Sequence, residues 1–229
     1  MFRPIILKSK ENWVKMATYD YVIWDLDGTL LDDRKRHYAC YLDIVEKYGG
    51  TPVSEERYWE LKRNKIKRTV LLEETAFEGT YQQYLDEWIN RIEQIGYLQR
   101  EELRPGAEEL LKKLHTATEK VVLVTMRNHT ERVEQQLQWL GIAGYFEAIF
   151  IGKSLQGQKK TDVVSTAIPD IAEKHVLVIG DTEDDEQVAK SLGADFVAMI
   201  TGLRDKKYLE ADCYADCIAD VADWIGLER

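Results

Sequence analysis

The amino-acid sequence predicts an α/β protein with a doubly wound parallel sheet and an inserted helical domain. Short apolar runs rich in Val and Ile recur along the chain, and most of the segments between them have the length and spacing of one helix. One interval, between the first two runs, is far longer than a crossover helix needs. With 229 residues, the chain is long enough for a core domain and a smaller insert.

Five apolar runs are expected to form the strands of the sheet. They cover residues 21–24, 121–124, 148–151, 176–179 and 196–200. Helices are expected at 132–140, 162–168 and 184–192, where apolar residues recur at helical spacing. Short strands that alternate with helices favour a parallel sheet covered by helices on both faces.

The long interval at 33–103 is interpreted as a helical insert. It contains no convincing strand, and the pairs Gly49-Gly50 and Glu78-Gly79 interrupt its helical pattern. The helical segments expected within it cover residues 36–48, 55–74 and 81–95.

The domain boundaries follow from this insert. Pro105-Gly106 marks the return of the chain to the core. We therefore expect an N-terminal extension at 1–18, a core domain made of 19–32 and 104–229, and a helical domain at 33–103.

Composition excludes several classes of function. The net charge of −10 argues against a nucleic-acid binder that depends on neutralising phosphates. No run of 18 apolar residues is present, so no membrane span or membrane partner is expected. Cys40, Cys213 and Cys217 are odd in number and sparse, which favours a reducing, cytoplasmic location over a disulfide framework. No His or Cys cluster accompanies them, so no zinc site is expected.

The most informative motif, Asp25-Leu26-Asp27-Gly28-Thr29, directly follows the first apolar run. Asp is depleted from strands, and an unpaired buried carboxylate is costly. Two acids this close repel each other unless a cation or a shared proton lies between them. The motif therefore calls for a chemical explanation.

Further polar clusters follow two other runs. In an open parallel sheet, ligands bind beyond the carboxyl ends of the strands, so these clusters should share one surface with Asp25 and Asp27. Oxygen ligands of this kind suit Mg²⁺, the expected cofactor, which in turn attracts phosphate oxygens. The clusters are Thr125, Arg127 and Asn128 after the second run, and Gly180, Asp181, Thr182, Glu183, Asp184 and Asp185 after the fourth.

These residue types can carry out phosphoryl transfer. A carboxylate can attack phosphorus to form an acyl phosphate, and a second carboxyl can protonate the leaving oxygen and then deprotonate water. The transferring group carries charge on three oxygens, so it needs hydrogen-bonding and positive neighbours. The hydroxyl of Thr125 and an ammonium group from the loop at 158–160 would supply them.

The same residues resemble the four motifs of the haloacid dehalogenase-like (HAD) hydrolase superfamily, in order and over residues 19 to 227. Asp25 to Thr29 is similar to the first motif, Thr125 to the second, Lys160 to the third and 180–185 to the fourth. The resemblance implies a Rossmannoid core.

The resemblance also implies roles for the acidic residues. Asp25 would be the nucleophile and Asp27 the general acid and base. Asp25, the main-chain carbonyl of Asp27 and Asp181 would hold magnesium, with Asp185 as a supporting acid. Because dehalogenases of this superfamily lack the second acid, Asp27 points to phosphoryl transfer.

The remaining positions are expected to bind the phosphoryl group or the substrate. Thr125 and Lys160 are implied phosphoryl ligands, although Lys159 could replace Lys160 because the motif lacks its usual Lys-Pro. Gly28, Arg127 and Asn128 are further candidate substrate contacts. Arg127 could equally pair with an acid of the core.

The helical insert resembles the cap of the phosphoglycolate phosphatase and β-phosphoglucomutase branch, which closes over the site and selects the leaving group. The basic run at 62–68 is interpreted either as a solvated helix face or as a source of substrate contacts from Arg63, Lys67 or Arg68.

The function expected from this sequence is that of a magnesium-dependent phosphatase. It would act on a small phosphorylated metabolite through an aspartyl-phosphate on Asp25. The alternatives are a phosphomutase of the β-phosphoglucomutase type and a non-catalytic HAD-like binding module. The sequence does not identify the substrate or the oligomeric state.

Overall fold

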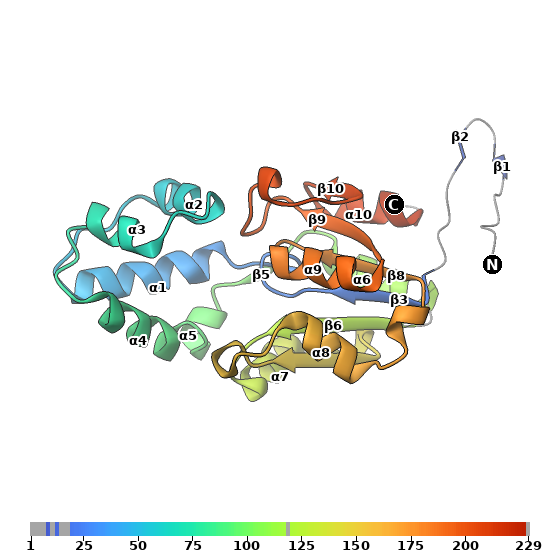
Figure 1. Cartoon of the computed structure of the whole chain (residues 1–229), viewed down its shortest axis with the longest axis horizontal. Helices are drawn as coiled ribbons and strands as arrows, with labels where there is room; N and C mark the ends of the chain where they lie inside the picture. The colour runs from blue at the N-terminus through green and yellow to red at the C-terminus, as the bar shows by residue number, and fades with distance from the viewer. Residues whose placement is uncertain (1–7, 10–11, 14–18, 118–119, 228–229) are drawn as a thin grey trace.

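The centre of the molecule is a six-stranded parallel sheet (Figure 1). The structure is a computed structural model and describes residues 8–9, 12–13, 19–117 and 120–227. The strands are β3 (Tyr21–Trp24), β6 (Lys120–Met126), β7 (Ala148–Gly152), β8 (Val176–Gly180), β9 (Asp195–Met199) and β10 (Cys213–Ala215). Their order is β10-β9-β8-β3-β6-β7, and all neighbours run parallel. The first apolar run thus forms a central strand, and the predicted α/β fold is confirmed.

Helices cover both faces of this sheet. Val22 and Trp24 of β3 lie in one hydrophobic cluster, and Tyr21 and Ile23 lie in another, because successive strand residues point to opposite faces. The flanking helices are α6 (Ala107–Ala117), α7 (Thr130–Trp139), α8 (Lys160–Ala167), α9 (Glu183–Leu192) and α10 (Ile218–Ile225). Side chains of α6, α7 and α10 join the Trp24 cluster, and those of α8 and α9 join the Ile23 cluster.

Two core elements were not predicted. Strand β10 has only three residues, and two of them are half-buried, so it shows no apolar run in the sequence. Helix α6 begins directly after Pro105-Gly106, which was interpreted only as a boundary. The last predicted strand, 196–200, begins and ends one residue earlier than expected.

The insert consists of five helices with a hydrophobic cluster of their own (Figure 1). Aromatic residues dominate this cluster, in which Tyr41 stacks on Tyr58 and Tyr84 stacks on Trp88. The helices are α1 (Arg34–Lys47), α2 (Glu55–Arg63), α3 (Arg68–Glu74), α4 (Tyr81–Arg91) and α5 (Ile95–Leu98). No helix of the described residues is long and apolar enough to cross a membrane.

The helix predicted at 55–74 was wrong, because the segment forms two helices. The side chain of Asn64 donates a hydrogen bond to the carbonyl of Glu60, and Lys65 adopts a left-handed backbone conformation with φ of 58°. Such a residue ends a helix. The segment predicted at 81–95 also divides, into α4 and α5.

The chain enters and leaves the insert through a short antiparallel pair that was not predicted. Strand β4 (Leu31–Asp32) pairs with β5 (Glu102–Leu103). The segment 33–103, in which no strand was expected, therefore ends in a short strand. Each strand has only two residues, too few for a period to be visible. A second short pair, β1 (Lys8–Ser9) with β2 (Asn12–Trp13), lies in the predicted N-terminal extension.

Candidate active site

Asp25 and Asp27 lie just beyond the carboxyl end of β3, between the ends of β6 and β8. This position follows from the parallel order of the three strands. The amide of Asp25 donates to the carbonyl of Ile179, which holds the start of the motif against β8. Both carboxylates face a cavity of about 450 Å³, which Thr125 and Asp181 also line.

The Asp25 carboxylate is buried and in contact with a cation. Nζ of Lys160 bonds its Oδ1, and the hydroxyl of Thr29 lies 3.4 Å from Oδ2. Burial raises the pKa of Asp25 to about 7, although the charge of Lys160 lowers it. Lys159 is exposed while Lys160 is buried, so the structure brings Lys160 and not Lys159 to Asp25.

Three acids form a candidate metal centre. Oxygen atoms of Asp25, Asp181 and Asp185 lie within 4.8 Å of one another, and all three residues are buried. Burial, followed by the charges of Asp25 and Asp185, raises the pKa of Asp181 well above its usual value. Lys160 is the one cation bonded within this group in the described chain, so three carboxyl groups share a single positive charge. A hard divalent cation bound among them would favour their ionised forms. The Asp27 carboxylate lies outside this group.

Asp181 is held by residues that sequence reasoning did not assign. Its Oδ1 accepts a bond of 3.2 Å from the hydroxyl of Thr29, and its Oδ2 accepts from the amide of Leu203. Gly28 has φ of +73°, and a Cβ there would lie 2.1 Å from Oδ2 of Asp181. Only glycine therefore fits this position. The motif contained Thr29, but nothing in the sequence linked it to Asp181.

Asp185 is fixed by the first turn of α9. Its Oδ2 accepts from the amide of Thr182 at 3.1 Å and from the Thr182 hydroxyl at 2.8 Å, while its Oδ1 lies 2.5 Å from Nζ of Lys160. A carboxylate at a helix N-terminus is also favoured by the helix dipole. These contacts place Asp185 so that it orients Lys160 toward Asp25.

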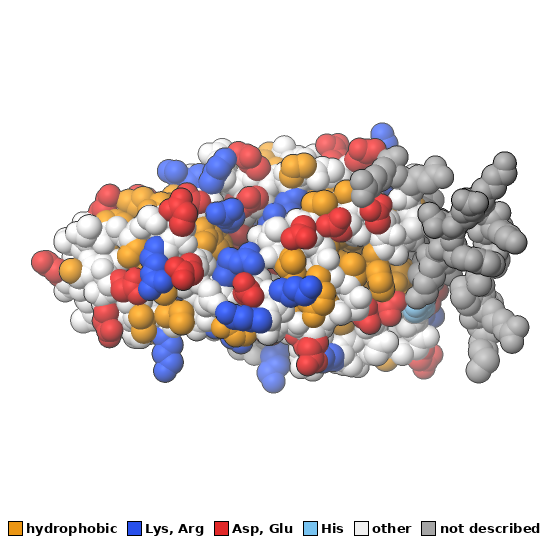
Figure 2. Space-filling model, turned by 90° about the horizontal axis from the view of Figure 1, so that it is seen from above, with side chains coloured by type: hydrophobic (Ala, Val, Ile, Leu, Met, Phe, Trp, Pro, Cys, Tyr) orange, Lys and Arg blue, Asp and Glu red, His pale blue; other side chains and the backbone are white. Residues whose placement is uncertain are grey.

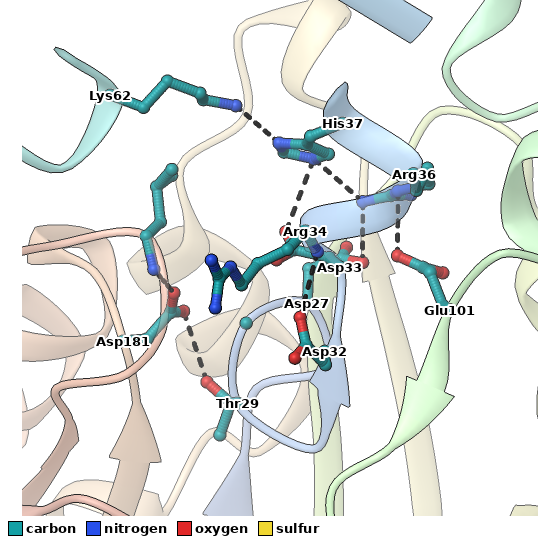
Figure 3. A network of polar contacts seen from close by, with 12 residues as sticks. Asp27, Thr29, Asp32, Asp33, Arg34, Arg36, His37, Lys62, Glu101 and Asp181 are labelled. Atoms are coloured by element: carbon teal, nitrogen blue, oxygen red, sulfur yellow. Dashed lines mark hydrogen bonds and ion pairs between the residues drawn. The ribbon is translucent and has the colours of Figure 1, made fainter. Parts of the chain in front are cut away.

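Asp27 has a different environment from Asp25. Its carboxylate pairs with Arg36 at 2.9 Å, and Arg36 in turn pairs with Glu101 at 2.8 Å (Figure 3). The carboxylate of Asp27 also pairs with Arg127. Burial disfavours ionisation of Asp27, but the two guanidinium groups outweigh it and hold the pKa of Asp27 well below its usual value. Burial raises the pKa of Glu101 to about 7.

This network bears on both interpretations of Arg127, which stay predictions. The residue pairs with Asp27 and Glu101, so the structure has it bonded to acids while it also lines the cavity. Arg36 and Glu101 were not predicted. They lie near the two crossings into the insert, and no local pattern marks residues whose partners are so far away in sequence.

The other two candidate substrate contacts have polar groups that are already bonded. Asn128 lines the cavity, but its amide donates to Glu93 at 2.9 Å and its side-chain oxygen accepts from the amide of Leu155. The carbonyl of Gly28 accepts from Arg104 at 2.9 Å. In this arrangement the missing side chain of Gly28 allows the Asp181 carboxylate to lie close to the main chain.

The insert supplies the other wall of the cavity. Arg68 and His37 lie there, together with four mainly apolar side chains: Leu85, Trp88, Ile89 and Ile92. The basic run divides among several roles. Arg63 donates to the carbonyls of Ile200 and Gly202, and Lys65 pairs with Glu183, so these two residues hold the insert against the core.

Comparisons with known proteins agree with this fold. The family model described as "Haloacid dehalogenase-like hydrolase" matches residues 22–199. A phosphoglycolate phosphatase of Synechococcus elongatus is 25% identical over 193 residues, which cover 84% of this chain and 89% of that protein. One from Vibrio parahaemolyticus is 25% identical over 223 residues, covering 90% of this chain and 96% of its own length.

Solved structures show the same fold. A predicted phosphoglycolate phosphatase from Haemophilus somnus superposes with a TM-score of 0.71 at 20% identity, over 90% of this chain and 97% of that chain. A haloacid dehalogenase-like family protein from Streptococcus pneumoniae superposes with a TM-score of 0.70 at 19% identity, over 90% and 98% of the two chains.

Proposed function

The chain belongs to the haloacid dehalogenase-like hydrolase family and is a phosphatase, and we propose that it hydrolyses a small phosphorylated metabolite through an aspartyl-phosphate on Asp25. One observation carries the proposal: the Asp25 carboxylate lies in the cavity between Lys160 and the acid Asp181. A nucleophile, a phosphate-binding cation and a candidate metal centre thus meet at one point.

Two displacement steps follow from this arrangement. An oxygen of Asp25 attacks phosphorus, the bond to the leaving oxygen breaks, and Asp27 donates a proton to that oxygen. Water then attacks the phosphorus of the aspartyl-phosphate, and Asp27 accepts the proton that the water loses. Inorganic phosphate and the free Asp25 carboxylate result. Lys160 and the buried hydroxyl of Thr125 donate to the phosphoryl oxygens throughout.

The metal site is proposed as magnesium. Asp25, Asp181, Asp185 and the main-chain carbonyl of Asp27 would hold the ion, which supplies positive charge for the phosphoryl oxygens. The donor set is made of oxygen atoms only, and its acids are buried and close together, so the residues fit such an ion.

The ion pairs of Asp27 matter for the proton transfers. Arg36 and Arg127 favour the ionised carboxylate, which is the form that accepts a proton from water. The form that donates a proton to the leaving group requires separation from at least one of the two arginines. The proton donor is therefore expected to form only when substrate rearranges this network.

We further propose that residues 33–103 act as the cap domain over this site. The insert lines one side of the cavity, and its Arg63 is bonded to core carbonyls. A cap of this kind excludes water from the aspartyl-phosphate.

A cytoplasmic location is also proposed, since all three cysteines are free. On the face in Figure 2 acidic and basic side chains are interspersed, which agrees with a small-molecule substrate rather than nucleic acid. The relatives named above are phosphatases, so the phosphomutase alternative gains no support.

Turnover of a generic phosphate ester by Asp25→Asn tests the proposal. We expect the phosphate release rate to fall by roughly 10³-fold or more, because the amide cannot form the acyl phosphate. Asp170→Asn, at an exposed position outside the cavity, is the matched control and should retain the parent rate. Chelation of divalent ions should abolish release and re-addition of Mg²⁺ should restore it. Full activity in Asp25→Asn would refute the nucleophile assignment.

A further inference from the structure

The end of α2 and the turn that follows it lie against two core segments beside Asp181 (Figure 1). Arg63, the last residue of α2, bonds the loop 200–204, which follows β9. Lys65, in the turn, pairs at 2.6 Å with Glu183, which lies two residues beyond Asp181 in the chain. One small part of the insert thus contacts both core segments that surround a proposed metal ligand.

The loop 200–204 holds the Asp181 carboxylate in place. The main-chain amide of Leu203 donates to Oδ2 of Asp181 at 2.5 Å. The main chain of Gly202 packs so closely on the same carboxylate that a Cβ there would lie 2.2 Å from Oδ2. A shift of the loop would therefore move this buried oxygen or leave it without its donor. Because groups that hold a metal ligand influence metal affinity, the position of the loop matters for the proposed metal ion.

Arg63 fixes this loop from the insert. Its guanidinium donates to the carbonyl of Ile200 at 2.7 Å and to the carbonyl of Gly202 at 2.9 Å, one bond on each side of Thr201. In the described chain, no other residue bonds to these two carbonyls. The rigid fork of a guanidinium fixes the relative position of two acceptors, which the point charge of an ammonium does not. Arg63 therefore constrains the shape of the loop as well as the position of the insert.

The core holds the same loop at other points. Arg104 donates to the carbonyl of Thr201 at 3.3 Å, and the amide of Ile200 donates to the carbonyl of Ala215 at 3.0 Å. These bonds keep the loop attached to the sheet without any help from the insert. Loss of the Arg63 side chain should therefore change the geometry of the loop rather than unfold it.

The charge of Arg63 allows its positional effect to be separated from a direct electrostatic effect. The guanidinium bonds neutral carbonyls, and among the described residues no carboxylate forms an ion pair with it. A positive charge repels a divalent cation, so removal of the charge alone would strengthen Mg²⁺ binding. Loss of the support for Asp181 would weaken Mg²⁺ binding. The two effects have opposite signs.

We propose that Arg63 is a positioning residue for the metal centre, because it fixes the loop 200–204 and, through this loop, the carboxylate of Asp181. The insert then contributes to metal affinity although every proposed ligand belongs to the core. This inference rests on the proposed function, whose metal ion it concerns.

Calorimetric titration of the full chain with Mg²⁺ alone tests the inference without turnover. The parent is compared with Arg63→Met, Arg63→Lys and Arg57→Met. Arg57 is the matched control, because it is an arginine of the same helix whose partners Glu60 and Glu74 both belong to the insert. Its loss removes a charge and two ion pairs of the insert but no contact with the loop. Since calorimetry fits the affinity separately from the number of sites, partial unfolding does not change the dissociation constant.

We expect Arg63→Met to raise the dissociation constant for Mg²⁺ by about 10-fold or more, as is usual when a group that holds a metal ligand is lost. Arg63→Lys should recover part of the affinity, and Arg57→Met should bind Mg²⁺ as the parent does. An unchanged or lower dissociation constant in Arg63→Met would overturn the inference, and so would an equal rise in Arg57→Met. If Arg63→Met does not fold, Arg63→Lys decides: it should bind Mg²⁺ more weakly than the parent, and parental affinity would overturn the inference.

Phosphate release at increasing Mg²⁺ concentration separates this inference from the proposed function. In Arg63→Met the Mg²⁺ concentration for half-maximal release should rise by the same factor as the dissociation constant, while kcat at saturating Mg²⁺ stays close to that of the parent. If the parent binds Mg²⁺ with an affinity that depends on Arg63 but releases no phosphate, the reaction assignment fails and the inference stands. If the parent releases phosphate and Arg63→Met binds Mg²⁺ as tightly, the inference fails and the reaction assignment stands. A parent that binds no Mg²⁺ overturns the inference together with the metal assignment.

Discussion

Asp25 and Asp27 lie two residues apart, yet their carboxylates have different charged neighbours. Asp25 contacts Lys160 beside two further acids, whereas Asp27 lies between Arg36 and Arg127. Because the environments differ, the two acids can have different chemical tasks. The proposed division is attack on phosphorus by Asp25 and proton transfer by Asp27.

Asp27→Asn tests this division by its dependence on the leaving group. Without a proton donor, we expect kcat for an alkyl phosphate to fall by roughly 10²- to 10⁴-fold, the usual contribution of general acid–base catalysis. The rate of aspartyl-phosphate formation from p-nitrophenyl phosphate should fall much less, because nitrophenolate leaves without a proton. Rapid-mixing measurement of nitrophenolate release gives that rate. Equal losses with both esters would contradict an acid role for Asp27.

At the scale of elements, the sequence predicted the polar residues that follow the strands better than the long-range contacts that fix the elements in place. Apolar runs predicted the strands β3, β6, β7, β8 and β9, and the parallel order then brought Asp25, Thr125 and Asp181 together. These are consequences of local pattern and of one topological rule. Lys160 was also favoured over Lys159, and the structure places Lys160 beside Asp25.

Other features depend on contacts that no local pattern carries. Strand β10 is defined by its pairing with β9, and the Arg36–Glu101 pair joins residues on either side of the insert. The break between α2 and α3 depends on one left-handed residue, Lys65, which the sequence does not distinguish from a helical lysine. Such features require the folded structure.

The basic run at the end of α2 is the clearest case of an element whose role changed. It was interpreted partly as a solvated helix face, but Lys62 points toward His37 and Arg63 reaches the core carbonyls. Because Lys62 is withdrawn from water, its charged form lowers the free energy of unfolding. Burial lowers the pKa of Lys62 to about 7, from 10.5 in an unfolded chain.

The stability of Lys62→Met should therefore depend on pH in a defined way. Between about pH 7 and pH 10, the unfolded parent holds a proton that the folded parent has released, so the parent gains stability as pH rises. Lys62→Met lacks this gain. Its advantage in free energy of unfolding over the parent should thus be greatest near pH 7 and shrink toward pH 10. Denaturant titrations at several pH values, with Lys67→Met as control, measure it; a difference independent of pH would contradict the assignment.

At the scale of the whole molecule, the core and the insert line opposite sides of one cavity. The core presents the acids and Lys160 at the ends of its central strands, and the insert contributes Arg68 and an apolar wall to the same cavity. Contacts from Arg63 and Lys65 hold the two parts together around it. In the proposed mechanism the chemistry depends on the core, and the choice of leaving group depends on the insert.

The central claim is that a phosphoryl group passes through Asp25. The most direct measurement is acid quenching of the enzyme during turnover, followed by peptide mass spectrometry. We predict a phosphoryl group on the peptide that contains Asp25, formed at least as fast as product and absent from Asp25→Asn. The parent should also release phosphate with retained configuration at phosphorus, as two displacements require. Inverted configuration, or a phosphoryl group on another residue, would contradict the account.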